Sequence, residues 1–186
     1  MRTLRLNDTE YAFCDELGME TVDVRELKLQ GCMGCGACER RIHHGGECAV
    51  ADDMQMLYPK IAQCEKLVFI CRQSFGCCSP KCKRILDRMA VLGYPEYTVK
   101  NRELTKKGWK IPLREIEFLL YGEATPQELA LFEEWLEEIH GITGVRSCVY
   151  SILVRRQHYV HTDFESESAQ AWNQCPVGKT YAGTAR

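Results

Sequence analysis

The sequence lacks the features that define several large functional classes. Its 24 Lys and Arg residues are balanced by 26 Asp and Glu residues, so we expect no basic surface for nucleic acid or for an anionic membrane. No apolar run approaches the roughly 18 residues that a membrane-spanning helix needs. The first thirteen residues contain no long apolar core, so we expect no secretory signal and a cytoplasmic location.

Cysteine, in contrast, is abundant, with 12 residues in a chain of 186. The cytoplasm keeps thiols reduced. We therefore expect these cysteines to be metal ligands, redox groups or buried apolar residues rather than a disulfide framework.

Short apolar strands alternate with helices along the first 155 residues. The run KLVFIC at 66–71 is almost continuously apolar, which is typical of a strand buried on both faces. Ser79-Pro80 and Thr125-Pro126 are signals for the start of a helix. We therefore expect one α/β domain over residues 1–155, a three-layer sandwich around a five-stranded parallel sheet. The expected strands are 3–6, 19–24, 66–71, 116–121 and 148–154, and the expected helices begin near residues 52, 79 and 125.

Three segments interrupt or follow this alternation. Pro59 lies within the first expected helix and predicts a late start or a kink there. Residues 94–112 form a long excursion between strands and are expected to carry a small hairpin. Residues 156–186 are polar and have no periodic apolar face, so we expect a C-terminal extension.

A glycine-rich cysteine motif, GCMGCGACERRIHHGGEC, occupies residues 31–48. The C-x2-C-x2-C spacing of Cys32, Cys35 and Cys38 allows three thiolates to converge on one centre, with Cys48 or Cys175 as a fourth ligand. Thiolates bind iron–sulfur clusters and structural zinc, and the tight triplet favours a 4Fe-4S cluster over zinc. Uncoordinated thiols lining a cofactor pocket are the alternative.

The segment RQSFGCCSP follows the third expected strand, at the edge of the sheet where ligands of α/β proteins gather. Phe75 beside Gly76 suits a flat ring stacked on the loop, and an ordinary turn is the alternative. The adjacent Cys77 and Cys78 stand on this rim, where redox activity is the less favoured interpretation. We expect Cys64, Cys71 and Cys82 to be buried packing residues with no chemical role.

Together these motifs resemble a known family. The cysteine run, the DDM at residues 52–54 and KLVFICRQSFGCCSPKCKRILDR at residues 66–88 are similar to the flavodoxin-like NAD(P)H-dependent FMN reductases, particularly their iron–sulfur flavoprotein branch. The resemblance covers residues 2–155, with the specific motifs confined to 31–88.

The resemblance implies a flavodoxin-like fold with strand order 2-1-3-4-5 and FMN at the strand ends. It also implies NAD(P)H or another electron donor as partner, and a homodimer or homotetramer. The implied FMN contacts are Ser74, Phe75, Gly76, Ser79, Tyr121, Gly122 and Glu123, and the implied ligands of a 4Fe-4S cluster are Cys32, Cys35, Cys38 and Cys48.

The sequence departs from the family pattern where FMN phosphate would bind. Family members have a small, glycine-rich loop and a full helix after the first strand, whereas this chain has Asn7-Asp8-Thr9-Glu10-Tyr11 and no glycine before Gly18. Acidic side chains there would repel a phosphate dianion. In addition, Cys38 and Cys48 are further apart than in the cluster-binding members.

Two functions therefore stay open at this point. The first is an oxidoreductase that uses FMN to transfer electrons from NAD(P)H, with or without an iron–sulfur cluster. The second is a non-enzymatic, cysteine-rich redox or metal-binding module of the same fold that has lost FMN. The loop at residues 7–10 discriminates between them.

Overall fold

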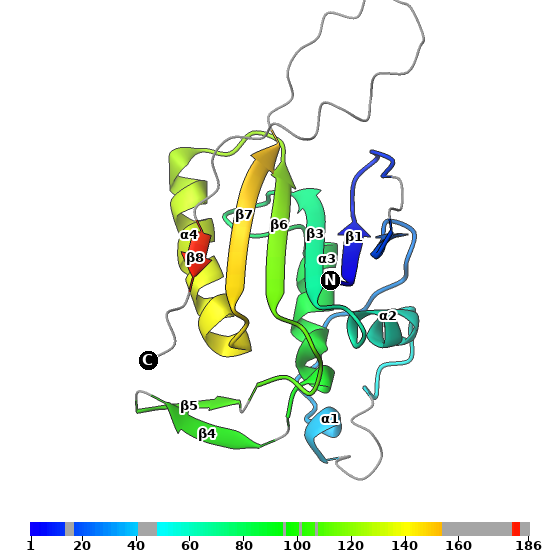
Figure 1. Cartoon of the computed structure of the whole chain (residues 1–186), viewed down its shortest axis with the longest axis vertical. Helices are drawn as coiled ribbons and strands as arrows, with labels where there is room; N and C mark the ends of the chain where they lie inside the picture. The colour runs from blue at the N-terminus through cyan, green and yellow to red at the C-terminus, as the bar shows by residue number, and fades with distance from the viewer. Residues whose placement is uncertain are drawn as a thin grey trace, which may run out of the picture.

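A parallel sheet forms the centre of the computed structural model, which describes residues 1–13, 17–40, 48–94, 96–100, 102–106, 108–153 and 180–182 (Figure 1). The strands lie in the order β2 (Met19–Asp23), β1 (Thr3–Asn7), β3 (Lys66–Arg72), β6 (Glu115–Tyr121), β7 (Ser147–Leu153) and β8 (Thr180–Ala182). The first five of these are parallel, and β8 adds to β7 in the antiparallel direction.

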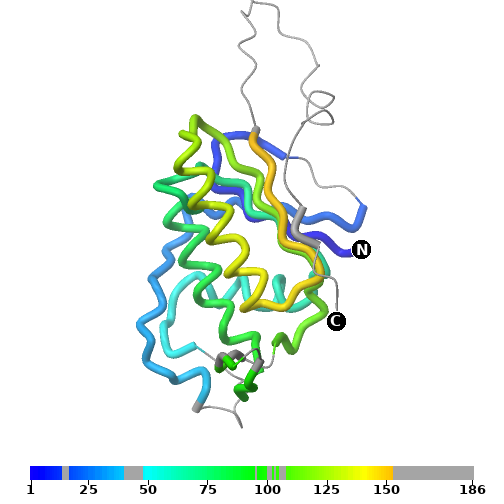
Figure 2. Tube along the Cα trace, turned by 90° about the vertical axis from the view of Figure 1, so that its left-hand side faces the viewer, coloured from blue at the N-terminus to red at the C-terminus, as the bar shows by residue number. Residues whose placement is uncertain are grey.

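Two helices, α3 (Pro80–Arg88) and α4 (Pro126–Thr143), lie side by side on one face of the sheet, as Figures 1 and 2 show. Both begin at the predicted caps. Ser79 accepts a hydrogen bond from the Cys82 amide, and Thr125 forms a capping box with Glu128. The smaller elements are α1 (Ala37–Arg40), α2 (Met54–Ile61), the 3-10 helix η2 (Met89–Leu92) and a separate hairpin of β4 (Tyr97–Lys100) and β5 (Glu103–Lys106).

The core lies between the sheet and these helices. Alternate residues of β6 are buried, as expected of a strand with one face under helices. The Phe118 ring stacks on Phe69 with centroids 5.1 Å apart and meets Phe132 of α4 edge-on at 5.6 Å. Each such ring contributes roughly 1.5–3 kcal/mol through burial, so this aromatic group fixes α4 against the central strands.

The expected α/β architecture with a parallel five-stranded sheet is confirmed, and it is consistent with a three-layer sandwich. The strand order differs in detail from the expected 2-1-3-4-5, because the hairpin β4–β5 intervenes in the chain between β3 and β6 and because β8 adds a sixth strand. That hairpin is the small hairpin predicted within residues 94–112. Helix α2 passes through Pro59 rather than starting after it.

The segment predicted to be a polar C-terminal extension, 156–186, contains β8; its other residues lie outside the described ranges. Within the described parts of the chain, no helix is both long and apolar enough to cross a bilayer.

Candidate functional site

The carboxyl ends of β1, β3 and β6 meet at one rim of the sheet and bring three loops together. The Asp8 amide donates a hydrogen bond to the Ile70 carbonyl at 2.8 Å, which joins the loop after β1 to β3. The Gln73 amide donates to the Tyr121 carbonyl at 3.3 Å, which joins the loop after β3 to β6. The residues predicted from the second and third of these loops to contact FMN are therefore neighbours in space.

The loop after β1 uses its own amides internally. The Asn7 Oδ1 atom accepts hydrogen bonds from the Thr9 amide at 3.1 Å and from the Thr9 hydroxyl at 2.7 Å. The Tyr11 amide donates to the Thr9 Oγ1 atom at 3.2 Å, and the Asp8 amide is already bonded to Ile70. A phosphate site needs several unpaired amides that point at one spot, and this loop does not offer them.

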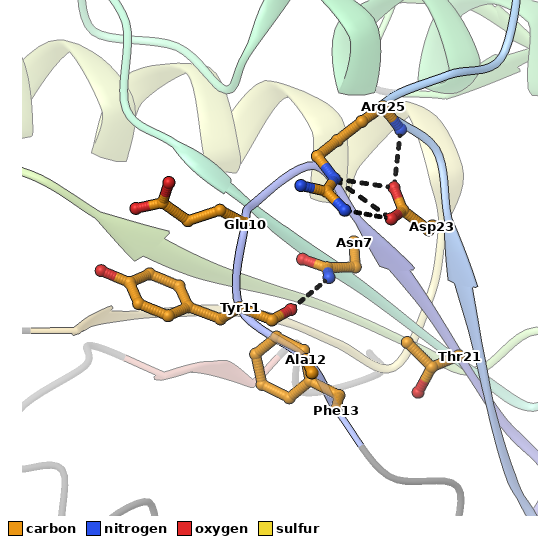
Figure 3. A pocket seen from close by; sticks show the side chains of 8 residues that line it. All are labelled: Asn7, Glu10, Tyr11, Ala12, Phe13, Thr21, Asp23 and Arg25. Atoms are coloured by element: carbon orange, nitrogen blue, oxygen red, sulfur yellow. Dashed lines mark hydrogen bonds and ion pairs between the residues drawn. The ribbon is translucent and has the colours of Figure 1, made fainter.

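A cavity of about 350 Å³ opens beside this loop, at the ends of β1 and β2. Figure 3 shows the guanidinium of Arg25, one of the lining residues, turned onto the carboxylate of Asp23. The Arg25 Nε atom lies 3.0 and 3.1 Å from the two Asp23 oxygens, and Nη2 lies 2.5 Å from Oδ2. These hydrogen bonds from Arg25 lower the pKa of Asp23. With Glu10 also on its wall, the described lining of the cavity carries no positive charge beyond that of Arg25, which Asp23 compensates.

The N-terminus of α3, the other position where an anion could bind, already faces a carboxylate of the chain. The Ser79 hydroxyl donates to Asp8 Oδ2 at 2.5 Å while accepting from the Cys82 amide at 3.3 Å. Burial raises the pKa of Asp8, although the Ser79 hydrogen bond opposes this shift. Asp8 thus lies where the helix end would otherwise attract a phosphate.

The loop after β3 begins with a tight two-residue turn. Ser74 and Cys77 exchange two backbone hydrogen bonds, of 2.9 and 3.0 Å, and the central residues Phe75 and Gly76 have φ angles of 50° and 73°. Glycine is required here, because an added Cβ would lie 2.7 Å from the Cβ of Leu131 on α4. The turn leaves the Phe75 side chain 92% exposed. A positive φ angle is itself uncommon for a bulky residue such as phenylalanine.

The loop after β6 lies beside this turn. The Tyr121 ring meets the Tyr11 ring edge-on, with centroids 6.1 Å apart. Gly122 has a φ angle of 98°, and a Cβ there would lie 3.6 Å from the Cγ atom of Arg72. Glu123 is exposed. The predicted ring-contact residues therefore lie on one rim, but the residues present do not fit the phosphate end of FMN.

Four cysteines meet where β3 ends and α3 begins. Cys71 lies in β3, Cys82 lies in the first turn of α3, and Cys77 and Cys78 lie on the loop between them. The Cys71 thiol interacts with those of Cys78 and Cys82, and the Cys77 thiol interacts with that of Cys78. We call this group the rim cysteine cluster. None of its members is in a disulfide, and only Cys77 is appreciably accessible.

The sulfurs of the rim cysteine cluster differ in their affinity for protons. Hydrogen bonds from Cys78 and Cys82 hold the pKa of Cys71 well below its usual range, although burial opposes this. The same hydrogen bonds, together with burial, raise the pKa values of Cys78 and Cys82. A hydrogen bond with Cys78 lowers the pKa of Cys77. Because the thiolate is the reactive form of cysteine, Cys71 and Cys77 are the members that lose their protons most readily, and of these two Cys77 is the accessible one.

Isolated buried cysteines in the same protein behave differently. Burial raises the pKa of Cys64 to about 12 and that of Cys148 to about 12. The burial of Cys64 confirms the prediction that it is a packing residue. Cys71 and Cys82, for which packing was also predicted, are buried too, but they belong to the rim cysteine cluster as well.

The glycine-rich motif lies away from the rim. Cys32 and Cys35 are exposed on the loop after β2, Cys38 is half-buried in α1, and Cys48 is half-buried before α2. Among the residues that the structure describes, which include these four, no group of three or more His, Cys, Asp or Glu side chains is arranged to hold a metal ion. The alternative fourth ligand, Cys175, lies outside the described residues.

A buried ion pair anchors the segment that follows this motif. The Arg88 Nη1 atom lies 2.7 and 2.5 Å from the two Asp52 oxygens, and the two side chains are 1% and 5% exposed. Asp52 Oδ2 also accepts from the Gln30 amide at 2.7 Å, and Arg88 Nη2 donates to the Val50 carbonyl at 3.1 Å. The pair therefore ties the end of α3 to the loop on which the cysteine motif lies.

The Cys48 thiol interacts with Arg88, one member of this ion pair. Burial disfavours the thiolate, but the Val50 amide and the nearby donor groups of Arg88 and Tyr58 outweigh burial and lower the pKa of Cys48. Cys48 therefore has polar neighbours on two helices, Tyr58 on α2 and Arg88 on α3.

Comparison with protein-family models, with curated proteins and with solved structures finds no match to this chain.

Proposed function

We propose that this protein is a flavodoxin-like redox module that works through cysteine sulfur rather than through bound FMN. The observation that supports this most strongly is the rim cysteine cluster, four cysteines gathered where β3 ends and α3 begins, at the edge where α/β sheets bind their ligands. It is the second of the two functions that the sequence leaves open.

The loop after β1 argues against the first function. A phosphate at this rim would meet the carboxylates of Asp8 and Glu10, and the amides that could bind it are occupied by Asn7, Thr9 and Ile70. Without its phosphate contacts, FMN would have to bind through its ring alone.

The contacts within the cluster suggest a route for thiol–disulfide exchange. The accessible Cys77 thiolate attacks an external disulfide, a new S–S bond forms, and the other external sulfur leaves as a thiolate. The external thiolate that has left takes the proton of the Cys78 thiol. Cys78 then displaces the second external sulfur to give a Cys77–Cys78 disulfide, which is strained because the residues are adjacent. Cys71 then attacks the Cys78 sulfur and releases Cys77.

The net reaction converts one external disulfide and two cluster thiols into a Cys71–Cys78 disulfide and two external thiols, which take up the two protons. The electron donor and acceptor are then thiols and disulfides rather than NAD(P)H. The strained intermediate favours the last step, because a Cys71–Cys78 disulfide does not join adjacent residues.

The test is to equilibrate the full chain with reduced and oxidised glutathione and to map disulfides by peptide mass spectrometry. We expect a reversible Cys71–Cys78 disulfide, no binding of added FMN, and slower oxidation of a Cys77→Ser variant. A Cys148→Ser variant is the control and should behave as wild type. Failure of any cluster disulfide to form, or stoichiometric binding of FMN, would contradict the proposal, and the second result would favour the FMN reductase.

A further inference from the structure

Away from the rim, two buried donors without normal partners converge on one half-buried cysteine. Tyr58 is 8% exposed and Arg88 is 2% exposed. In the described part of the chain, the Tyr58 hydroxyl and the Arg88 Nε atom are buried and have no hydrogen-bond partner of normal geometry. Both side chains nevertheless lie close to the Cys48 sulfur.

Buried donors without a hydrogen-bond partner need an explanation, because each lowers the stability of the folded protein by about 1–3 kcal/mol. Here the donors are held firmly in place. The other guanidinium nitrogens of Arg88 are bonded to Asp52 and to the Val50 carbonyl. The guanidinium also lies over the Tyr58 ring, with Cζ 6.0 Å from the ring centroid. Neither side chain is free to turn toward another acceptor.

We propose that Cys48 is a site of oxidation by hydroperoxides, at which the Tyr58 hydroxyl and the Arg88 guanidinium hold the oxygen that the sulfur acquires. An S–O bond forms and the peroxide O–O bond breaks. The sulfur gives up two electrons, and the thiol proton leaves in the water that is released, so that thiol and hydrogen peroxide give sulfenic acid and water. The new oxygen accepts hydrogen bonds from donors that otherwise lack them.

This site goes beyond the proposed thiol–disulfide function, because it uses a different cysteine and a different oxidant. Cys48 can fail as a peroxide site while the rim cysteine cluster exchanges disulfides, and the reverse also holds. The two proposals are therefore distinguishable residue by residue.

The experiment uses the full chain, reduced and treated with chelator, then exposed to hydrogen peroxide with a dimedone-type probe for sulfenic acid. Mass spectrometry reports the labelling of each cysteine in the same sample. We expect Cys48 to label well before the exposed Cys32. Tyr58→Phe removes only a hydroxyl that has no hydrogen-bond partner among the described residues of the reduced protein, so the variant should fold. It should slow labelling of Cys48 by roughly two- to tenfold, because the new oxygen on sulfur loses one hydrogen bond.

Tyr150→Phe is the matched control. It deletes a phenol oxygen that donates to Glu133 at 2.8 Å, remote from Cys48, and it should leave the labelling of Cys48 unchanged. Equal labelling of Cys48 and Cys32, or unchanged labelling in Tyr58→Phe, would overturn the inference. So would anaerobic iron reconstitution that protects Cys48 together with Cys32, Cys35 and Cys38, because Cys48 would then be a cluster ligand.

Discussion

Replacing Asp52 with asparagine should remove a large part of the stability of this protein. Asp52 and Arg88 are 5% and 1% exposed, so the variant leaves a guanidinium buried without its counter-charge. Breaking a buried pair in this way costs about 3–5 kcal/mol, against a total stability of roughly 5–15 kcal/mol for a typical domain. With a urea dependence of about 2 kcal/mol per M, the unfolding midpoint should fall by roughly 2 M.

The control is Asp87→Asn on α3. Asp87 pairs with Lys83 one turn away at 2.5 Å, but these side chains are 42% and 38% exposed. An exposed pair of this kind contributes only about 0.3–0.5 kcal/mol, so this variant should unfold close to wild type. Equal urea midpoints for the Asp52 and Asp87 variants, measured by circular dichroism, would refute the argument from burial.

The remaining predictions concern the rim. Gly76→Ala should destabilise the protein by about 1 kcal/mol or more in thermal unfolding, because its φ angle is 73° and the added Cβ would lie 2.7 Å from the Cβ of Leu131. Gly141→Ala is the control: its added Cβ would meet nothing within 4 Å, so the variant should be neutral or stabilising. Burial raises the pKa of Asp8 above its ordinary value of 3.8, so the folded state binds this proton more tightly and the free energy of unfolding decreases as pH rises above 3.8. Asp8→Asn should remove that decrease and be more stable than wild type at pH 7 in urea titrations; a variant less stable at pH 7 would contradict the sign. Ser79→Ala should cost about 1 kcal/mol through loss of the α3 cap, and unchanged thermal stability would show that the cap is dispensable.

The alternating strands and helices of this fold could be predicted because their signals are local. The apolar run at 66–71 forms β3 in the structure, and the predicted capping residues Ser79 and Thr125 are the N-caps of α3 and α4. The edge strand β8 could not be predicted, because a three-residue strand depends on pairing with β7 and carries no pattern of its own.

The candidate site was only partly predictable. The acidic loop after β1 suggested a poor phosphate site, but the internal hydrogen bonds of Asn7 and the contact between Asp8 and Ser79 depend on tertiary structure. Cys71 and Cys82 were predicted to be packing residues, because a periodic apolar pattern does not distinguish a buried thiol among hydrocarbons from one beside other thiols. The proximity of both residues to Cys77-Cys78 was the available signal.

The iron–sulfur cluster predicted from the cysteine motif stays a prediction. The spacing of the motif suggested convergence of Cys32, Cys35, Cys38 and Cys48, but spacing alone does not show where the loop places each thiol. In the structure, Cys48 turns toward Arg88 and Tyr58, which lie on α3 and α2 and are distant in the sequence.

A redox titration of the flavin-free full chain against the glutathione couple, with the free thiols counted at each point, distinguishes electron transfer by cysteine sulfur from electron transfer by FMN. We predict a reversible transition in which two cluster thiols are lost and regained together, and we predict that added FMN leaves the curve unchanged. A chain that exchanges no electrons until FMN is added, and then binds it stoichiometrically, would contradict the account.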